Sequence, residues 1–139
     1  MPVIAIDVGE RRIGIAVSDP SETYALPLRT LERTKLRDDL AEIVAVAESH
    51  AAGTIVVGDP ISLAGQRGIA SEKMDEFCAA LARAYGGTIA RIDERLTTAQ
   101  VTRTLIEADV SRAKRKRVVD QLAAALILDS YLARRRNAR

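Results

Sequence analysis

The sequence has 139 residues, of which 47% are hydrophobic, and a formal net charge of +2, which suits one domain over residues 1–139 with one core. No apolar run is long enough to span a bilayer, and no signal-peptide pattern follows Met1, so we expect a cytoplasmic protein without membrane contact. A lone cysteine, Cys78, excludes an internal disulfide, and the absence of tryptophan argues against a base-stacking platform.

The first half of the chain predicts four strands and one helix. The apolar run Val3-Ile4-Ala5-Ile6 predicts a buried strand with Asp7 near its carboxyl end. After a turn at residues 9–11, large and small residues alternate over 13–18 and predict a second strand that returns as a hairpin. Residues 24–31 fit a third strand. A helical pattern over 36–47 then leads to a fourth strand at 54–58, which indicates a change to parallel pairing.

The second half predicts a loop, three helices and the last strand. Residues 60–68 carry two glycines and indicate a loop, and the helix through 74–81 ends at Gly86-Gly87. Residues 88–92 fit a fifth strand, and a capping box at Thr97 predicts a helix, with Asp93 and Glu94 in the turn between them. The last helix is expected from about 115 to 134. This order predicts an α/β fold with a mixed five-stranded sheet, an antiparallel three-strand start, then parallel strands, and helices on both faces.

Acidic residues occur where predicted strands end and on the last helix. Functional groups of open α/β sheets gather at the carboxyl ends of parallel strands, where Asp7 and the pair Asp93 and Glu94 fall. Asp120 shares a helix face with apolar residues, where a carboxylate needs a partner. Carboxylates from separate elements are hard oxygen ligands that suit Mg²⁺ or Mn²⁺. Each acid also has a structural explanation of its own, such as a salt bridge from Asp120 to Lys116.

A basic cluster precedes Asp120 and consists of Lys114, Arg115, Lys116 and Arg117. Ser111 is a plausible N-cap, but positive charge opposes the dipole at the start of a helix, and a bound anion would relieve this conflict. We therefore expect contact with a phosphate backbone, and a solvated face is the alternative. Arg11, Arg12 and Arg95 are expected to add to the same surface, without reading base sequence.

Several segments together resemble the YqgF/RuvX family of RNase H-like proteins. The most specific are Asp93-Glu94-Arg95-Leu96-Thr97-Thr98 and the basic run that leads to Val118-Val119-Asp120. Others that match are Ile6-Asp7-Val8-Gly9, Arg12 through Pro20, and Val56-Val57-Gly58. The resemblance covers essentially the whole chain. One departure is Gly58-Asp59-Pro60, where the family usually has Gly-Leu-Pro; Asp59 is either a fourth ligand or a turn residue.

The resemblance implies an RNase H-like fold, akin to Holliday junction resolvases, and a divalent-metal nuclease site. Carried over by position, Asp7, Glu94 and Asp120 would be both catalytic residues and metal ligands, with Asp93 an alternative to Glu94 and one or two metal ions. It also implies a role in processing the 5′ end of pre-16S ribosomal RNA. The expected partners are then pre-rRNA, or ribosomal precursor particles that contain it.

Other functions remain open on the sequence alone. Within nucleases, the alternative is resolution of Holliday junctions in four-way DNA, which would favour a homodimer, whereas RNA trimming is open to a monomer. The Asp-x-Gly opening also resembles the phosphate loop of actin-like ATPases and sugar kinases, which need two such domains. A non-catalytic nucleic-acid-binding regulatory module is the alternative of another class.

Overall fold

The computed structural model describes residues 1–59, 69–93 and 112–138 and contains a mixed five-stranded sheet. The strand order is β3-β2-β1-β4-β5. In chain order the strands are β1 (Val3–Val8), β2 (Arg12–Ser18), β3 (Ala25–Glu32), β4 (Thr54–Asp59) and β5 (Thr88–Asp93). The first three pair antiparallel, and β4 and β5 extend the sheet in parallel from β1. The predicted antiparallel start and parallel continuation are confirmed.

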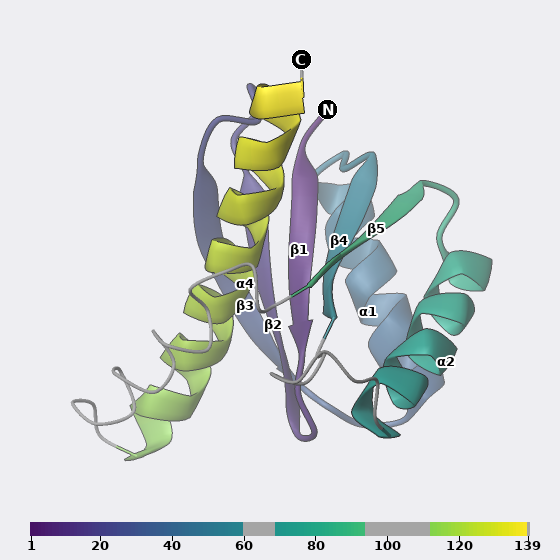
Figure 1. Ribbon diagram of the computed structural model, residues 1–139. Coiled ribbons are helices and arrows are strands. Elements are labelled where there is room, and N and C mark those ends of the chain that lie inside the picture. Colours follow the sequence, from purple (N-terminus) through teal and green to yellow (C-terminus); the bar gives the residue numbers. More distant parts are fainter. Residues whose placement is uncertain (60–68, 94–111, 139) are drawn as a thin grey trace.

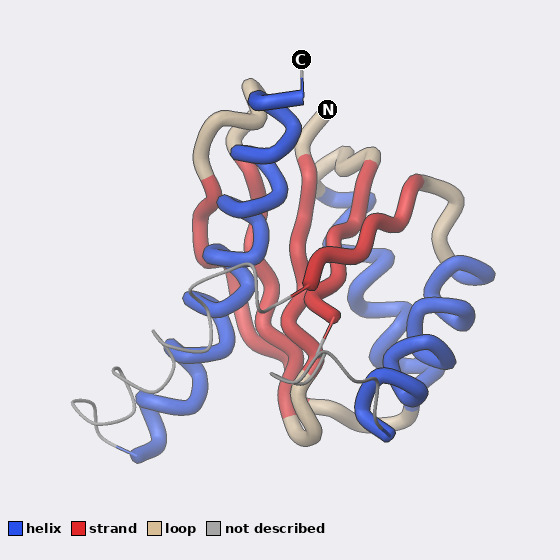
Figure 2. Tube along the Cα trace, viewed as in Figure 1, coloured by secondary structure: helices blue, strands red, loops and turns tan. Residues whose placement is uncertain are grey.

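Helices cover both faces of this sheet. Helices α1 (Leu36–Ser49) and α2 (Ile69–Ala84) lie against one face, and α4 (Arg112–Ala138) crosses the other (Figures 1 and 2). Helix α4 is longer at both ends than the predicted 115–134. The added residues include no glycine or proline, and Arg135 and Arg136 in its last turn favour the negative end of the helix dipole. The loop predicted at 60–68 and the helix predicted after Thr97 lie outside the described residues.

Side-chain size distinguishes the two faces of the sheet. The side that meets α1 and α2 carries large residues such as Ile4, Ile6 and Ile15, all fully buried. The side that meets α4 carries Ala5 and Ala16 on the neighbouring strands, with alanines of α4 packed on them. Because successive strand residues point to opposite faces, the alternation of large and small residues in β1 and β2 places the large side chains on one face and the small ones on the other. The small face lets α4 lie close to the central strands.

The C-terminal end of α4 is fixed to the turn between β2 and β3. Arg135 donates to Glu22 at 2.5 Å, and Arg136 donates to the carbonyl of Thr23 at 3.3 Å. Glu22 has a positive φ of 58°, and the carboxylate of Asp19 accepts the backbone N–H of Thr23 at 2.7 Å, which holds the turn. The helix runs from this turn along the sheet toward the end of the strands at which β1 ends, and its first turns extend sideways beyond the strands (Figure 1). No helix in residues 1–59, 69–93 or 112–138 is long and apolar enough to cross a membrane.

Candidate nuclease site

Asp7 and Asp120 meet at one glycine on the α4 face of the sheet. Asp7 lies in β1 and pairs with Gly14 of β2, and directly paired Cα atoms are about 4.5–5.5 Å apart. A Cβ placed on Gly14 would lie 2.0 Å from the backbone oxygen of Asp120 and 3.0 Å from its Cβ. Both carboxylates thus start beside Gly14, from a strand and from the helix that crosses it. The expectation that these two acids converge is supported by this contact.

The orientation of Asp7 follows from the strand alternation. Val3 and Ala5 of β1 pack with α4, and Asp7 is the next residue on that face. Asp7 is 5% exposed, and Asp120 is half-buried. Burial of a carboxylate is costly unless polar or charged groups around it offset the lost hydration. Two hard oxygen donors at one place fit a divalent metal ion.

The third predicted acid, Glu94, lies outside the described residues. Among the residues that the structure describes, no three histidine, cysteine or acidic side chains gather to hold a metal ion. Asp93, the alternative to Glu94, ends β5 and pairs with Asp59 of β4. Ile92 packs on the α4 side, so alternation places Asp93 on the opposite face from Asp7.

Asp59 has a structural partner on the face covered by α1 and α2. Its carboxylate lies 3.0 Å from a guanidinium nitrogen of Arg91, and the same guanidinium contacts Asp75 of α2 at 2.6 Å. Asp59 is 7% exposed, so this ion pair offsets the cost of its burial. Alternation places its side chain away from Asp7. Asp59 is the last residue of β4 and not a turn residue, and its ion pair on this face argues against the other expectation, that it is a fourth ligand.

The predicted basic residues are only partly described. Arg11 is exposed in the turn after β1, at the end of the strand near which Asp7 lies. Arg12 begins β2, and its Nε is 3.2 Å from a carboxylate oxygen of Glu32 on β3, which directs it along the sheet. The backbone of residues 114–117 forms part of the N-terminal end of α4, but the side chains of Lys114, Arg115, Lys116 and Arg117 lie outside the described atoms. Arg95 also lies outside the described residues.

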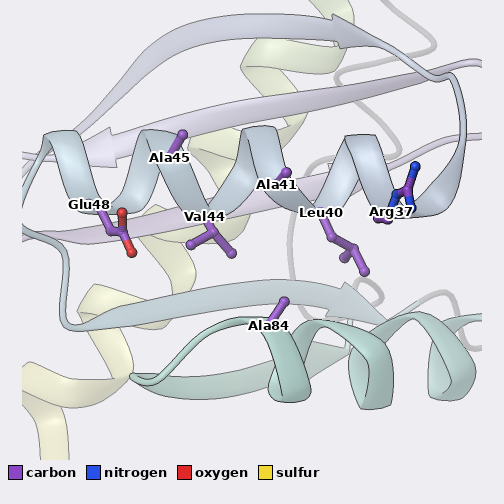
Figure 3. A pocket seen from close by; sticks show the side chains of 7 residues that line it. All are labelled: Arg37, Leu40, Ala41, Val44, Ala45, Glu48 and Ala84. Carbon is purple, nitrogen blue, oxygen red and sulfur yellow. The ribbon is translucent and has the colours of Figure 1, made fainter.

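A groove on the other face of the sheet is separate from this site. It encloses about 400 Å³ between α1 and α2, is lined mainly by Leu40, Val44 and three alanines, and has Arg37 and Glu48 toward its two ends (Figure 3). The sheet lies between this groove and Asp7. Cys78 of α2 is buried on the same side of the sheet as the groove, and this burial raises the pKa of its thiol.

One feature of the site was not recognised in the sequence. Gly14 stood out only as one of the small residues that alternate along the second strand, and nothing local shows that a helix from the far end of the chain contacts it. The signal that was available is its position opposite Asp7 in the predicted hairpin, where an absent side chain leaves room beside a carboxylate.

Comparisons with known proteins identify relatives and structural neighbours. Residues 1–134 match the family model described as RuvX, Holliday junction resolvase. A Clostridium tetani protein is 42% identical over 132 residues, which cover 95% of this chain and 96% of that protein. A Desulforudis audaxviator protein is 40% identical over 139 residues, covering 100% and 99%. Both are named for a proposed nuclease activity on pre-16S rRNA.

Two solved resolvases share the fold at low sequence identity. Thermus thermophilus RuvC, in complex with a Holliday junction, has a TM-score of 0.58 and 16% identity, with 97% of this chain and 96% of that chain covered. A fowlpox virus resolvase, also bound to junction DNA, has a TM-score of 0.53 and 9% identity, covering 96% and 98%. At these identities the likeness establishes the RNase H-like fold of the resolvases, as the sequence predicted.

Proposed function

The chain belongs to the RuvX family, and we propose that it is a divalent-metal-dependent nuclease that processes the 5′ end of pre-16S rRNA in the cytoplasm. The observation that carries the proposal is the meeting of Asp7 and Asp120 at Gly14. An acid of β1 and an acid of α4 that lie beside one glycine could supply oxygen ligands from two separate elements to one ion. Such an arrangement suits a divalent cation held between β1 and α4.

We assign Asp7, Asp120 and Glu94 as the residues that hold Mg²⁺ or Mn²⁺. Glu94 is preferred to Asp93 because strand alternation turns Asp93 to the α1 and α2 face, away from Asp7. When bound, the metal would activate the attacking water and stabilise charge on the phosphate. Asp7 and Asp120 would fix the position of the metal ion, since they belong to rigid elements packed against each other at Gly14.

The basic residues would bind the substrate backbone. Helix α4 carries Lys114, Arg115, Lys116 and Arg117 less than two turns before Asp120, so phosphates bound there would lie near the carboxylates. Arg11 adds a positive charge in the turn after β1, at the same edge of the sheet. Arg12 and Arg95 are further candidates, and Arg12 would first have to leave Glu32.

Pre-16S rRNA is the preferred substrate because relatives of at least 40% identity over nearly their full length are named for it. Four-way DNA is the second candidate. It is favoured by the family description and by the fold shared with a resolvase bound to a Holliday junction. A non-catalytic binding module would retain the basic surface without needing the paired acids.

Cleavage assays separate these candidates. The purified protein is incubated with pre-16S 5′-leader RNA and with a four-way DNA junction, in Mg²⁺, in Mn²⁺ and in chelator, with Asp7→Asn as the control. Metal-dependent cleavage of the RNA, lost in the variant, is the expected result. Cleavage of the junction alone would assign the protein to the resolvases, and binding without cleavage under every condition would contradict nuclease activity.

A further inference from the structure

Arg33, just after β3, connects three parts of the molecule. Its guanidinium donates to the backbone oxygen of Gly9 at 2.9 Å, in the turn of residues 9–11 that joins β1 and β2. Its Nε lies 3.7 Å from a carboxylate oxygen of Asp39 in α1. Its guanidinium carbon also lies 5.9 Å from the centre of the Phe77 ring of α2, within the range of a cation–π contact.

The backbone of Arg33 holds the same turn. Its N–H donates to the backbone oxygen of Arg11 at 2.8 Å, so Arg33 binds both ends of the turn, Gly9 through the side chain and Arg11 through the main chain. The N–H of Gly9 donates to the oxygen of Arg12 at 2.8 Å and closes the turn on itself. Such a turn has few conformations left.

Asp39 keeps Arg33 in place. It is 3% exposed, and one of its oxygens accepts from the backbone N–H of Thr34 at 2.9 Å and from the Thr34 hydroxyl at 3.0 Å. The other oxygen faces Arg33. A carboxylate fixed in this way by the residue that follows Arg33 limits the rotamers that the arginine can adopt.

We propose that Arg33, held by Asp39, is a positioning residue that presents Arg11 to a phosphate of the substrate. The inference rests on the proposed function, because it takes Arg11 as a backbone contact near Asp7. The side chain of Arg33 is 28% exposed, and its guanidinium contacts Gly9, Asp39 and Phe77. Its effect on the substrate therefore acts through the turn, where Arg11 is exposed at the edge at which β1 ends.

The first test measures the turn itself in the free protein. Residue-resolved amide hydrogen exchange is compared between the wild type, Arg33→Met and Arg29→Met. Arg29→Met is the matched control, since it also removes an ion pair between an arginine and α1, here from β3 to Glu42 at 3.8 Å. Exchange at Gly9 and at residue 33 should accelerate about tenfold in Arg33→Met alone, because a charge-assisted hydrogen bond is removed. Unchanged exchange there would overturn the proposal.

The second test measures binding of labelled pre-16S leader RNA and of a four-way DNA junction, with Ca²⁺ in place of Mg²⁺. Arg33→Met should weaken binding about three- to tenfold, as expected for a weakened phosphate contact. In an Arg11→Ala background the same substitution should have no further effect. An equal penalty with and without Arg11 would show that Arg33 acts by another route and would refute the positioning role.

Arg33→Lys provides one further comparison. Arg33→Lys keeps a charge opposite Asp39 and one donor for Gly9, so its exchange and binding should lie between those of the wild type and Arg33→Met. If Arg33→Met does not fold, the exchange and binding measurements on Arg33→Lys test the proposal in its place. If the wild type binds neither nucleic acid, the proposed function fails, and the exchange experiment still decides whether Arg33 holds the turn.

Discussion

Gly14→Ala should displace the helix that carries Asp120. The new methyl carbon would lie 2.0 Å from the Asp120 oxygen and 2.3 Å from its carbonyl carbon, both backbone atoms that cannot rotate away. Helix α4 would have to move by roughly 1 Å, and a displacement of that size in a catalytic group costs about 100-fold in rate. Overpacking of this kind also costs about 1–3 kcal/mol of stability.

The assay compares kcat for cleavage and the thermal unfolding midpoint with those of the wild type. Gly86→Ala is the matched control, because its Cβ would meet nothing within 4 Å, and it should leave both quantities nearly unchanged. Alanine fits a strand at least as well as glycine does, so a reduced rate or midpoint at Gly14 reports the close approach of Asp120 and not strand propensity. Wild-type kcat and an unchanged midpoint in Gly14→Ala would refute the conclusion that α4 rests on this glycine.

Two further predictions concern the basic cluster and an acidic turn. Replacing Lys114, Arg115 and Lys116 with glutamine should weaken nucleic-acid binding and lower the slope of log K against log salt by about 0.7–0.9 for each phosphate that the protein no longer neutralises. The control is Arg134→Gln, which is exposed toward the other end of α4 and should leave the slope unchanged. An unchanged slope in the triple variant would show that the cluster faces solvent and does not contact phosphate. The Ser21 hydroxyl, with the N–H groups of the same turn, lowers the pKa of Asp19 from 3.8 to about 2. The stabilisation from the charge of Asp19 is therefore complete above pH 3.8 and disappears as the pH falls through about 2. The thermal unfolding midpoint of the wild type should fall toward that of Asp19→Asn over this range. A difference between the two midpoints that does not change with pH would contradict the role of the charge.

The sheet could be predicted because its strands carry strong local signals. The apolar run of β1 and the alternation in β2 each define one strand, and their short connection defines the hairpin. The ends of α4 were missed because charged residues continue a helix as readily as they end it, and only tertiary contacts such as Arg135 with Glu22 fix its C-terminal part.

The candidate site was predictable only in part. Asp7 and Asp120 could be chosen from strand ends and helix faces, but their meeting at Gly14 depends on how α4 crosses the sheet, and no local pattern encodes that crossing. The role of Asp59 in an ion pair depends on Arg91 of the neighbouring strand β5, and no pattern in the sequence shows that these two residues are in contact. Asp39 gave no signal beyond that of an acid in the first turn of a helix, and its burial comes from long-range packing.

The most direct test of the metal site measures Mn²⁺ binding and cleavage together in Asp7→Asn and Asp120→Asn. Asp129→Asn, an exposed position on the same helix as Asp120, is the control. Both site variants should fold, bind Mn²⁺ more weakly and show kcat reduced by more than about 100-fold, because each removes a ligand charge with little change in volume. Wild-type metal affinity and cleavage in either site variant would contradict the assignment of Asp7 and Asp120 as the metal-binding pair.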